Sequence, residues 1–182
     1  MKGLKDKVVI VTGGAGGIGS ATCRRLAEEG AKVAIFDMNI AAAEKLAAEI
    51  NQQNGQALAV QCDITQNTVV EQAVQQVEAE LGPIDGLVNN AGWDIFKPFI
   101  KTNPQEWEKL IQINLVGMLN MHFAVLKGMV ERNSGSIVNI ASDAARVGSS
   151  GEAVYAACKG GLLSFSKTLA REHSRHNIRS LS

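Results

Sequence analysis

The chain has 182 residues, 46% of them hydrophobic, with 18 basic and 18 acidic side chains. This size and composition predict one globular domain over residues 1–182, and a formal charge of zero argues against a nucleic-acid or membrane surface. We find no run approaching the ~18 apolar residues of a spanning helix and no cleavage-type site, so we expect neither a membrane span nor a signal peptide.

Cysteine and histidine are both scarce in this chain. The three cysteines are odd in number and have no metal-like spacing, which favours a reducing, cytoplasmic location. The three histidines do not gather with cysteines or carboxylates, so we expect no metal site.

The first predicted element is a strand that runs into a glycine-rich turn. Residues 8–11 form a short apolar run rich in β-branched side chains, which is typical of a buried parallel strand. The turn TGGAGGIG at 12–19 follows, and then a helical pattern over 20–29. Glycines allow close approach of a diphosphate, and a helix N-terminus offers free N–H groups. We therefore favour a phosphate-binding loop over a merely flexible turn.

The second strand, 32–37, ends in a carboxylate. Asp37 lies 18 residues after Gly19, close to the ~20 expected for an acid that binds the adenosine ribose of a dinucleotide. Its charge would repel a 2′-phosphate, and no Arg or Lys stands at Ala15, Met38 or Asn39 to attract one. The sequence therefore predicts NAD rather than NADP, with a solvent-exposed acid as the alternative.

Strands and helices then continue to alternate. We predict helices over 40–51 and 68–81 and strands over 57–62 and 86–88. This order predicts an α/β fold of Rossmann type, a doubly wound parallel sheet with helices on both faces. Ligands bind beyond the carboxyl ends of such strands. The glycine turn, Asp37, Asp63 and Asn90 all fall at such ends.

The second half begins with a bulky apolar loop over 93–102. Asn103, Pro104 and Glu106 have the pattern of a capped helix start, and the helix runs, with room for a kink, to about residue 132. It contains Asn114, whose side chain either makes a structural hydrogen bond or holds a water molecule, and the sequence does not decide between the two. A fifth strand over 137–141 delivers Ser142, and a helix follows over about 153–173.

Tyr155 and Lys159 are four residues apart, so on a helix they share one face. A cation close to a phenol favours the phenolate and lowers its pKa from the usual value of about 10. The hydroxyl of Ser142 can hold a substrate oxygen against the tyrosine. These groups suit proton transfer to and from an alcohol, although the Tyr-x-x-x-Lys spacing alone is common by chance.

With these motifs in order, the chain resembles the short-chain dehydrogenase/reductase family, in its single-domain form. The turn Thr12-Gly13-x-x-x-Gly17-x-Gly19 matches the family's cofactor loop, and Asn89-Asn90-Ala91-Gly92 matches the motif after its fourth strand. Asn114, Ser142, Tyr155 and Lys159 match its catalytic tetrad. The resemblance implies that NAD is bound by Thr12, Gly13, Gly17, Ile18, Gly19, Asp37, Asp63, Ile64, Asn90, Ala91, Gly92, Tyr155 and Lys159.

The resemblance also implies a mechanism. Tyr155 is expected to act as general base, Ser142 to fix the substrate oxygen, and Lys159 to lower the pKa of the tyrosine and bind the nicotinamide ribose. Asn114 is expected to hold a water that links Lys159 to solvent. A homodimer or homotetramer is expected through the two long helices around Asn114 and Tyr155.

Within the family, the stretches NNAGWDIFKPF and SDAARVGSSGEAVYAACK are most similar to dehydrogenases of 2-hydroxycyclohexanecarboxyl-CoA. They are less similar to 3-oxoacyl-thioester reductases. The first likeness implies oxidation of a 3-hydroxyacyl-CoA with NAD; reduction of a 3-oxoacyl-ACP or another carbonyl is the alternative. Trp93 either lines the pocket beside a ring-shaped acyl group or packs in the core. An Asp143–Arg146 surface pair and a packing role for Cys158 are favoured over functional roles.

The chain departs from the family after residue 178, where the family continues into further strands and a substrate lid. We therefore expect a C-terminally truncated domain, a lost sixth strand and a fifth strand left as an exposed apolar edge. The third alternative is accordingly an NAD-binding fragment with weak or no turnover.

Overall fold

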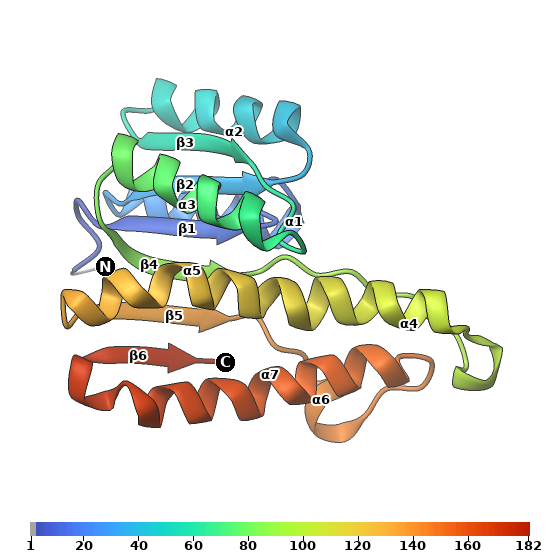
Figure 1. Ribbon diagram of the computed structural model, residues 1–182. Helices are drawn as coiled ribbons and strands as arrows, with labels where there is room; N and C mark the ends of the chain where they lie inside the picture. The colour runs from blue at the N-terminus through green and yellow to red at the C-terminus, as the bar shows by residue number, and fades with distance from the viewer. Residues whose placement is uncertain (1–2) are drawn as a thin grey trace.

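The computed structural model describes residues 3–182. A six-stranded, all-parallel sheet has the strand order β3-β2-β1-β4-β5-β6 (Figure 1). The strands are β1 Val8–Thr12, β2 Lys32–Asp37, β3 Gln56–Gln61, β4 Ile84–Asn89, β5 Gly135–Asn139 and β6 Ile178–Leu181. The order reverses between β1 and β4, and this is the point at which open α/β sheets bind ligands. The predicted Rossmann-type architecture is confirmed.

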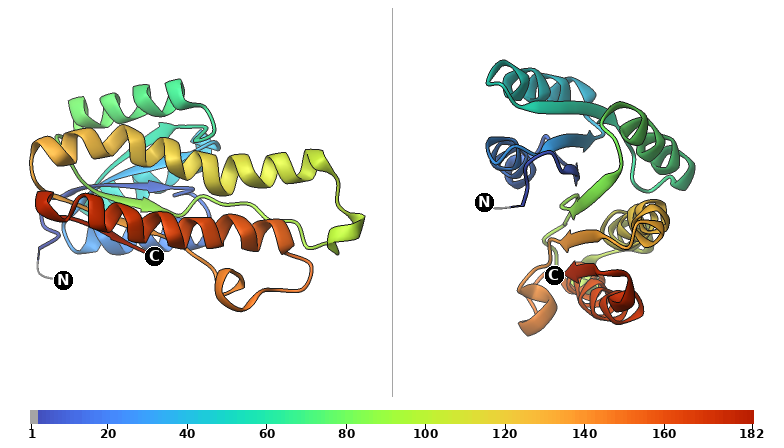
Figure 2. Two further views of the ribbon diagram at one scale, coloured as in Figure 1. Left: turned by 60° about the horizontal axis from the view of Figure 1, so that its bottom comes forward. Right: turned by 90° about the vertical axis from the view of Figure 1, so that its left-hand side faces the viewer.

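Helices cover both faces of the sheet (Figure 2). One core cluster joins α1 and α2 to β1 and β2 through Val9, Cys23, Val33 and Leu46. The other joins α3 and α5 to the opposite face through Ile10, Val70, Met121 and Ile137. The α-helices are α1 Gly17–Glu28, α2 Ile40–Gln52, α3 Asn67–Glu80, α4 Pro104–Ile111, α5 Gly117–Glu131, α6 Ala144–Val147 and α7 Ala153–Glu172.

The sixth strand corrects one expectation. Residues 178–181 pair in parallel with β5, with Gly135 opposite Ile178 and Val138 opposite Leu181. On this side of the sheet the edge strand is therefore the short β6, and β5 is an interior strand. The alternation of Ile178 and Ser180, both buried, with exposed neighbours is the pattern of a strand with one covered face. The apolar β5 is thus not the exposed edge that the sequence led us to expect.

The kink that the sequence allowed is a π-helical turn. Gln112–Val116 separates α4 from α5 and has Asn114 at its centre. Such turns insert an extra residue into a helix and are frequent at functional sites. The stretch Pro104–Glu131 is long and apolar enough to cross a membrane by length and composition alone. Here Met121, Val125 and Met129 bury its apolar face against the sheet.

A buried polar cluster links the central strands to α5 and α7. Asn89 donates to Asn139 at 2.8 Å, and Asn139 donates to the Ser166 hydroxyl at 2.9 Å. His122 lies beside them, with Nδ1 2.8 Å from the Met118 carbonyl, which assigns the ring proton to Nδ1. Burial lowers the pKa of His122 from 6.5 to about 4, so the ring is neutral near neutral pH.

Candidate active site

The glycine turn after β1 is fastened to the end of β4. The hydroxyl of Thr12 accepts hydrogen bonds from the backbone N–H groups of Asn90 and Ala91, both at 3.0 Å. The Asn90 side chain donates to the carbonyls of Thr12 and Gly13 at 3.0 and 3.1 Å. These contacts hold the start of α1 and the Asn-Asn-Ala-Gly segment on opposite sides of one cleft.

Two glycines of the turn have different surroundings. A Cβ at Gly19 would lie 2.1 Å from the carbonyl oxygen of Gly13, so this position is closed to any side chain. A Cβ at Gly17 would meet nothing within 4 Å. Gly17 and Ile18 are exposed at the N-terminus of α1, where free N–H groups favour an anion. The turn is therefore open on the side where a diphosphate would approach.

Asp37 stands at the other end of the cleft. Its carboxylate accepts hydrogen bonds from the Ala15 N–H at 3.0 Å and the Asn39 N–H at 2.9 Å. These bonds fix the carboxylate beside the glycine turn and leave lone pairs for ribose hydroxyls. Ala15, Met38 and Asn39, the residues beside this carboxylate, carry no positive charge that would attract a 2′-phosphate.

The cleft between these residues has a volume of about 570 Å³, a size typical of cofactor pockets. Asp63 is held there by its own turn, since its carboxylate accepts from the N–H and hydroxyl of Thr65. Ile64 supplies an apolar wall. The lining residues are Gly13, Gly16, Gly17, Asp37, Met38, Cys62, Asp63, Ile64, Thr65, Asn90, Ala91, Gly92, Trp93, Lys109 and Ile113. The space, the acid and the open glycine fit a nicotinamide dinucleotide.

The predicted catalytic side chains converge beside this cleft. The Ser142 hydroxyl hydrogen-bonds the Tyr155 side chain, and the Lys159 ammonium lies 5.6 Å from the centre of the Tyr155 ring. Lys159 is 4% exposed and donates to the Ile140 carbonyl at 2.8 Å. A Cβ at Gly92, a cleft residue, would be 3.8 Å from the Lys159 ammonium. The three groups therefore adjoin the cofactor end of the site.

Asn114 makes structural hydrogen bonds in this structure. Its amide nitrogen donates to the carbonyls of Trp93 at 2.6 Å and Leu110 at 3.0 Å, and its oxygen accepts from the Trp93 N–H at 3.2 Å. Asn114 thus holds the segment after β4 against the π-turn. The water-holding role stays a prediction.

The pKa of Tyr155 shifts in the direction opposite to the one expected. Burial raises the pKa above 10, the Ser142 hydroxyl lowers it, and the charges of Asp94 and Glu152 raise it further. The ammonium of Lys159, itself with a pKa lowered by burial, is not among the causes of this shift. The expected lowering by Lys159 is therefore not seen in this structure, where burial raises the pKa of the phenol and Lys159 is not among the groups that shift it.

The acids that act on Tyr155 form a pair that the sequence analysis missed. Burial and then the Glu152 carboxylate raise the pKa of Asp94, whereas hydrogen bonds from Ser149 and then from Asp94 lower the pKa of Glu152. As the pH rises, Asp94 therefore loses its proton after Glu152 does. The signal was weak, because Asp94 and Glu152 lie far apart in the sequence and only the folded loops bring them together.

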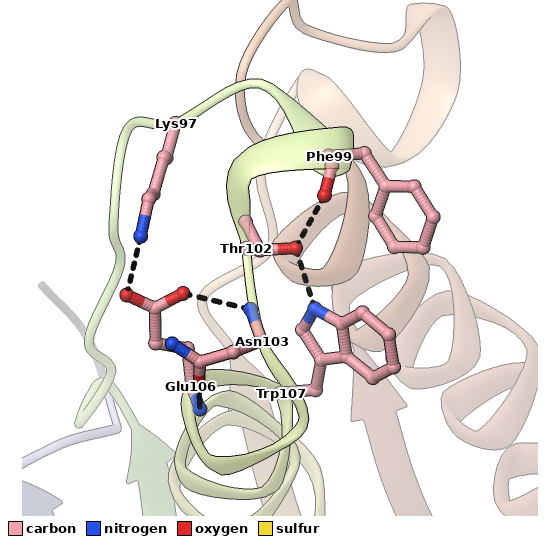
Figure 3. A network of polar contacts seen from close by, with 6 residues as sticks. All are labelled: Lys97, Phe99, Thr102, Asn103, Glu106 and Trp107. Atoms are coloured by element: carbon pink, nitrogen blue, oxygen red, sulfur yellow. Dashed lines mark hydrogen bonds and ion pairs between the residues drawn. The ribbon is translucent and has the colours of Figure 1, made fainter.

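Polar contacts hold the loop that follows Asp94 to the start of α4 (Figure 3). Asn103 and Glu106 form the predicted capping box, and Lys97 pairs with the Glu106 carboxylate at 2.8 Å. Trp107 donates its indole N–H to Thr102 at 2.6 Å. In addition, the Lys97 N–H donates to the Gly151 carbonyl at 2.8 Å, which joins this loop to the turn before Tyr155.

Asp143, Arg146 and Cys158 have the structural roles that the sequence favoured. Asp143 and Arg146 form an exposed pair at 3.9 Å. Cys158 is buried, and burial raises the pKa of its thiol, so it packs rather than reacts. The Trp93 ring lines the cleft and lies under the Lys109 ammonium, 4.1 Å from its centre. Lys109 is a cleft residue that the sequence analysis did not single out.

Residues 7–181 match the model of the short chain dehydrogenase family. The chain therefore belongs to this family and is an oxidoreductase. It is 38% identical over 177 residues to a 3-oxoacyl-[acyl-carrier-protein] reductase of Chlamydia muridarum, with 97% of this chain and 71% of the relative covered.

Two solved structures are also similar. An NAD⁺-bound xylitol dehydrogenase has a TM-score of 0.95 and 37% identity, and the match covers 98% of this chain and 69% of that one. A gluconate 5-dehydrogenase from Burkholderia cenocepacia, in complex with NADP and tartrate, has a TM-score of 0.93 and 33% identity, with 97% and 69% covered.

Proposed function

We propose that this protein is an NAD-dependent dehydrogenase that oxidises a secondary alcohol. The observation that carries the proposal is the convergence of Ser142, Tyr155 and Lys159 beside a cleft that ends at Asp37. Bound NAD supplies the carbon that accepts the hydride. The preference for NAD rests on the carboxylate of Asp37, which would repel the 2′-phosphate of NADP, and on the absence of a cation at Ala15, Met38 and Asn39.

The residues divide the chemistry among them. The Ser142 hydroxyl donates a hydrogen bond to the substrate oxygen and keeps it against the Tyr155 oxygen. Tyr155, once deprotonated, would take the proton from the hydroxyl oxygen while hydride leaves the carbon that bears that hydroxyl. Lys159 is rigidly placed by Ile140 and supplies a buried donor for the nicotinamide ribose. In the reverse direction Tyr155 returns the proton to a carbonyl oxygen.

For the substrate we propose a 3-hydroxyacyl-CoA of the 2-hydroxycyclohexanecarboxyl type. The support is the likeness of residues 89–99 and 142–159 to that class, together with exposed apolar side chains on the loop that contacts the turn before Tyr155, where a Cβ at Gly151 would lie 3.3 Å from the Phe96 ring. Phe96 is 76% exposed and Ile100 91% exposed, on the loop joined to the Tyr155 segment through Lys97. The Asp94–Glu152 pair disfavours an anionic group next to the reacting carbon, and a thioester is neutral there.

We also propose a homodimer or homotetramer through α5 and α7. The support is Phe123, an aromatic side chain on α5 that is 73% exposed. Leu119, four residues earlier on the same helix face, is 36% exposed, and apolar side chains grouped on a surface mark interaction sites.

The test is NAD-linked oxidation by the purified chain, screened over 3-hydroxyacyl-CoAs and simple secondary alcohols, with wild type beside Tyr155→Phe. We expect turnover of a hydroxyacyl-CoA by wild type and binding of NAD by both proteins. Turnover by Tyr155→Phe near the wild-type rate would refute the catalytic assignment. NAD binding without any turnover by wild type would favour the NAD-binding fragment, and preferential use of NADPH with 3-oxoacyl-ACP would favour the reductase.

A further inference from the structure

Lys109 extends from α4 over the wall of the cofactor cleft. It lies one helical turn before Ile113, and both residues line the cleft. The ammonium is 4.1 Å from the centre of the Trp93 ring, a cation–π contact that holds an otherwise mobile side chain at this place. Lys109 is exposed on its helix, so its ammonium is free to reach a ligand in the cleft.

The charges in the cleft are unbalanced. Its ionisable acids are Asp37 and Asp63, and Lys109 is the one Lys or Arg among its lining residues. Both carboxylates accept hydrogen bonds from backbone or hydroxyl donors of their own loops. Across residues 3–182, the Lys109 ammonium meets no hydrogen-bond acceptor and no carboxylate, and the Trp93 ring is its only close partner. Three N–H donors are therefore available to a ligand.

We infer that Lys109 binds a phosphate of the dinucleotide and so acts as a cofactor-binding residue. This inference rests on the proposed function, because the ligand is its cofactor. A charge-assisted hydrogen bond to a phosphate is stronger than a cation–π contact at an exposed site, so the ammonium would leave the indole for the anion. Without a ligand the Lys109 ammonium lies over the Trp93 ring, and on binding of the dinucleotide it would move from the ring to a phosphate.

The position of the cleft favours phosphate over a substrate carboxylate. The same cleft is lined by Gly13, Gly16 and Gly17, at the end of α1 that favours anions. Ser142 and Tyr155 are not among its lining residues. Lys109 thus faces the cofactor rather than the reacting carbon.

The test compares Lys109→Gln with wild type by calorimetry, with NAD, ADP-ribose and adenosine as ligands. We expect the Kd for NAD and for ADP-ribose to rise about threefold to tenfold, and the Kd for adenosine, which has no phosphate, to stay unchanged. Added salt should weaken NAD binding by wild type more than by Lys109→Gln. Lys167→Gln, which removes an exposed charge on α7 outside the cleft, is the matched control and should bind as wild type does.

Three outcomes overturn the inference. An unchanged Kd for NAD in Lys109→Gln, with normal binding by wild type, removes the role of Lys109 and leaves the proposed function intact. An equal loss of adenosine binding assigns Lys109 to packing rather than to phosphate. Absence of NAD binding by wild type removes both proposals. Lys109→Arg keeps the charge and should retain most of the affinity, which separates a lost charge from a disturbed helix.

Discussion

The hydroxyl of Thr12 accepts the backbone N–H of Asn90, a residue 78 positions later, at 3.0 Å. Thr12 is fully buried, and its hydroxyl also accepts the N–H of Ala91. The Thr12 hydroxyl and the Asn90 side chain, which donates to the Thr12 and Gly13 carbonyls, therefore hold the two walls of the cofactor cleft together. The glycine turn is thus a rigid part of the fold, and its glycines have separable roles.

Gly17→Ala and Gly19→Ala should separate binding from folding. A methyl group at Gly17 meets no protein atom within 4 Å, so we expect an unchanged melting temperature and at least a tenfold weaker affinity for NAD, because the group occupies the diphosphate's approach. A methyl group at Gly19 would lie 2.1 Å from the Gly13 oxygen and should lower the melting temperature. Calorimetry with NAD and thermal unfolding measure the two effects. Tight NAD binding by Gly17→Ala would contradict the assignment of the turn.

Asp37→Asn should weaken the preference for NAD. The substitution keeps the size of the side chain but removes the charge that would repel a 2′-phosphate. We expect the Kd for NAD to rise and the Kd for NADP to fall, with the ratio of the two changing by about tenfold or more. Binding measurements with both cofactors check this. A ratio that does not move would mean that Asp37 does not contact the adenosine ribose.

The Asp94–Glu152 pair should control the ionisation of Tyr155. Near the pKa of the tyrosine, above 10, both acids are ionised, so Asp94→Asn removes a negative charge and should lower the pKa of Tyr155. Ser142→Ala removes a hydrogen bond to Tyr155 and should raise it. Tyr155 is the only tyrosine in the chain, so the ultraviolet absorbance of tyrosinate titrates it directly.

The control for this titration is Tyr155→Phe, which must abolish the signal. An unchanged midpoint in both Asp94→Asn and Ser142→Ala would show that neither side chain acts on the phenol.

His122 should make the protein sensitive to acid. The pKa of His122 is about 4 in the folded chain against 6.5 when exposed, so the unfolded state binds the proton more tightly. The free energy of unfolding therefore has its full contribution from the neutral ring above pH 6.5. This contribution falls by about 3 kcal/mol as the pH drops toward 4. Denaturant unfolding of wild type and His122→Gln from pH 7 to 4 checks this, since the variant lacks this titration. Parallel pH dependences for the two proteins would count against it.

The motifs that carry the chemistry were readable in the sequence because each is local. The strand before the glycine turn, the capping box at Asn103 and the Tyr155–Lys159 spacing all depend on neighbours within a few residues. The Asp94–Glu152 pair, the Lys109–Trp93 contact and the His122 cluster depend on packing between distant segments. The fate of the last strand was misjudged for a similar reason, because four residues from 178 are enough when β5 offers a ready partner.

The hydrogen bond from Lys97 to Gly151 has a consequence for substrate selection. It couples the aromatic loop to the turn that leads directly into the tyrosine helix, so the two sides of the reaction pocket cannot spread independently. If the protein has the function we propose, a bulky acyl group that displaced one side would also pull on Tyr155. Size discrimination would then show itself as poor proton transfer as well as weak binding, and enlarging the pocket would require changes on both segments together.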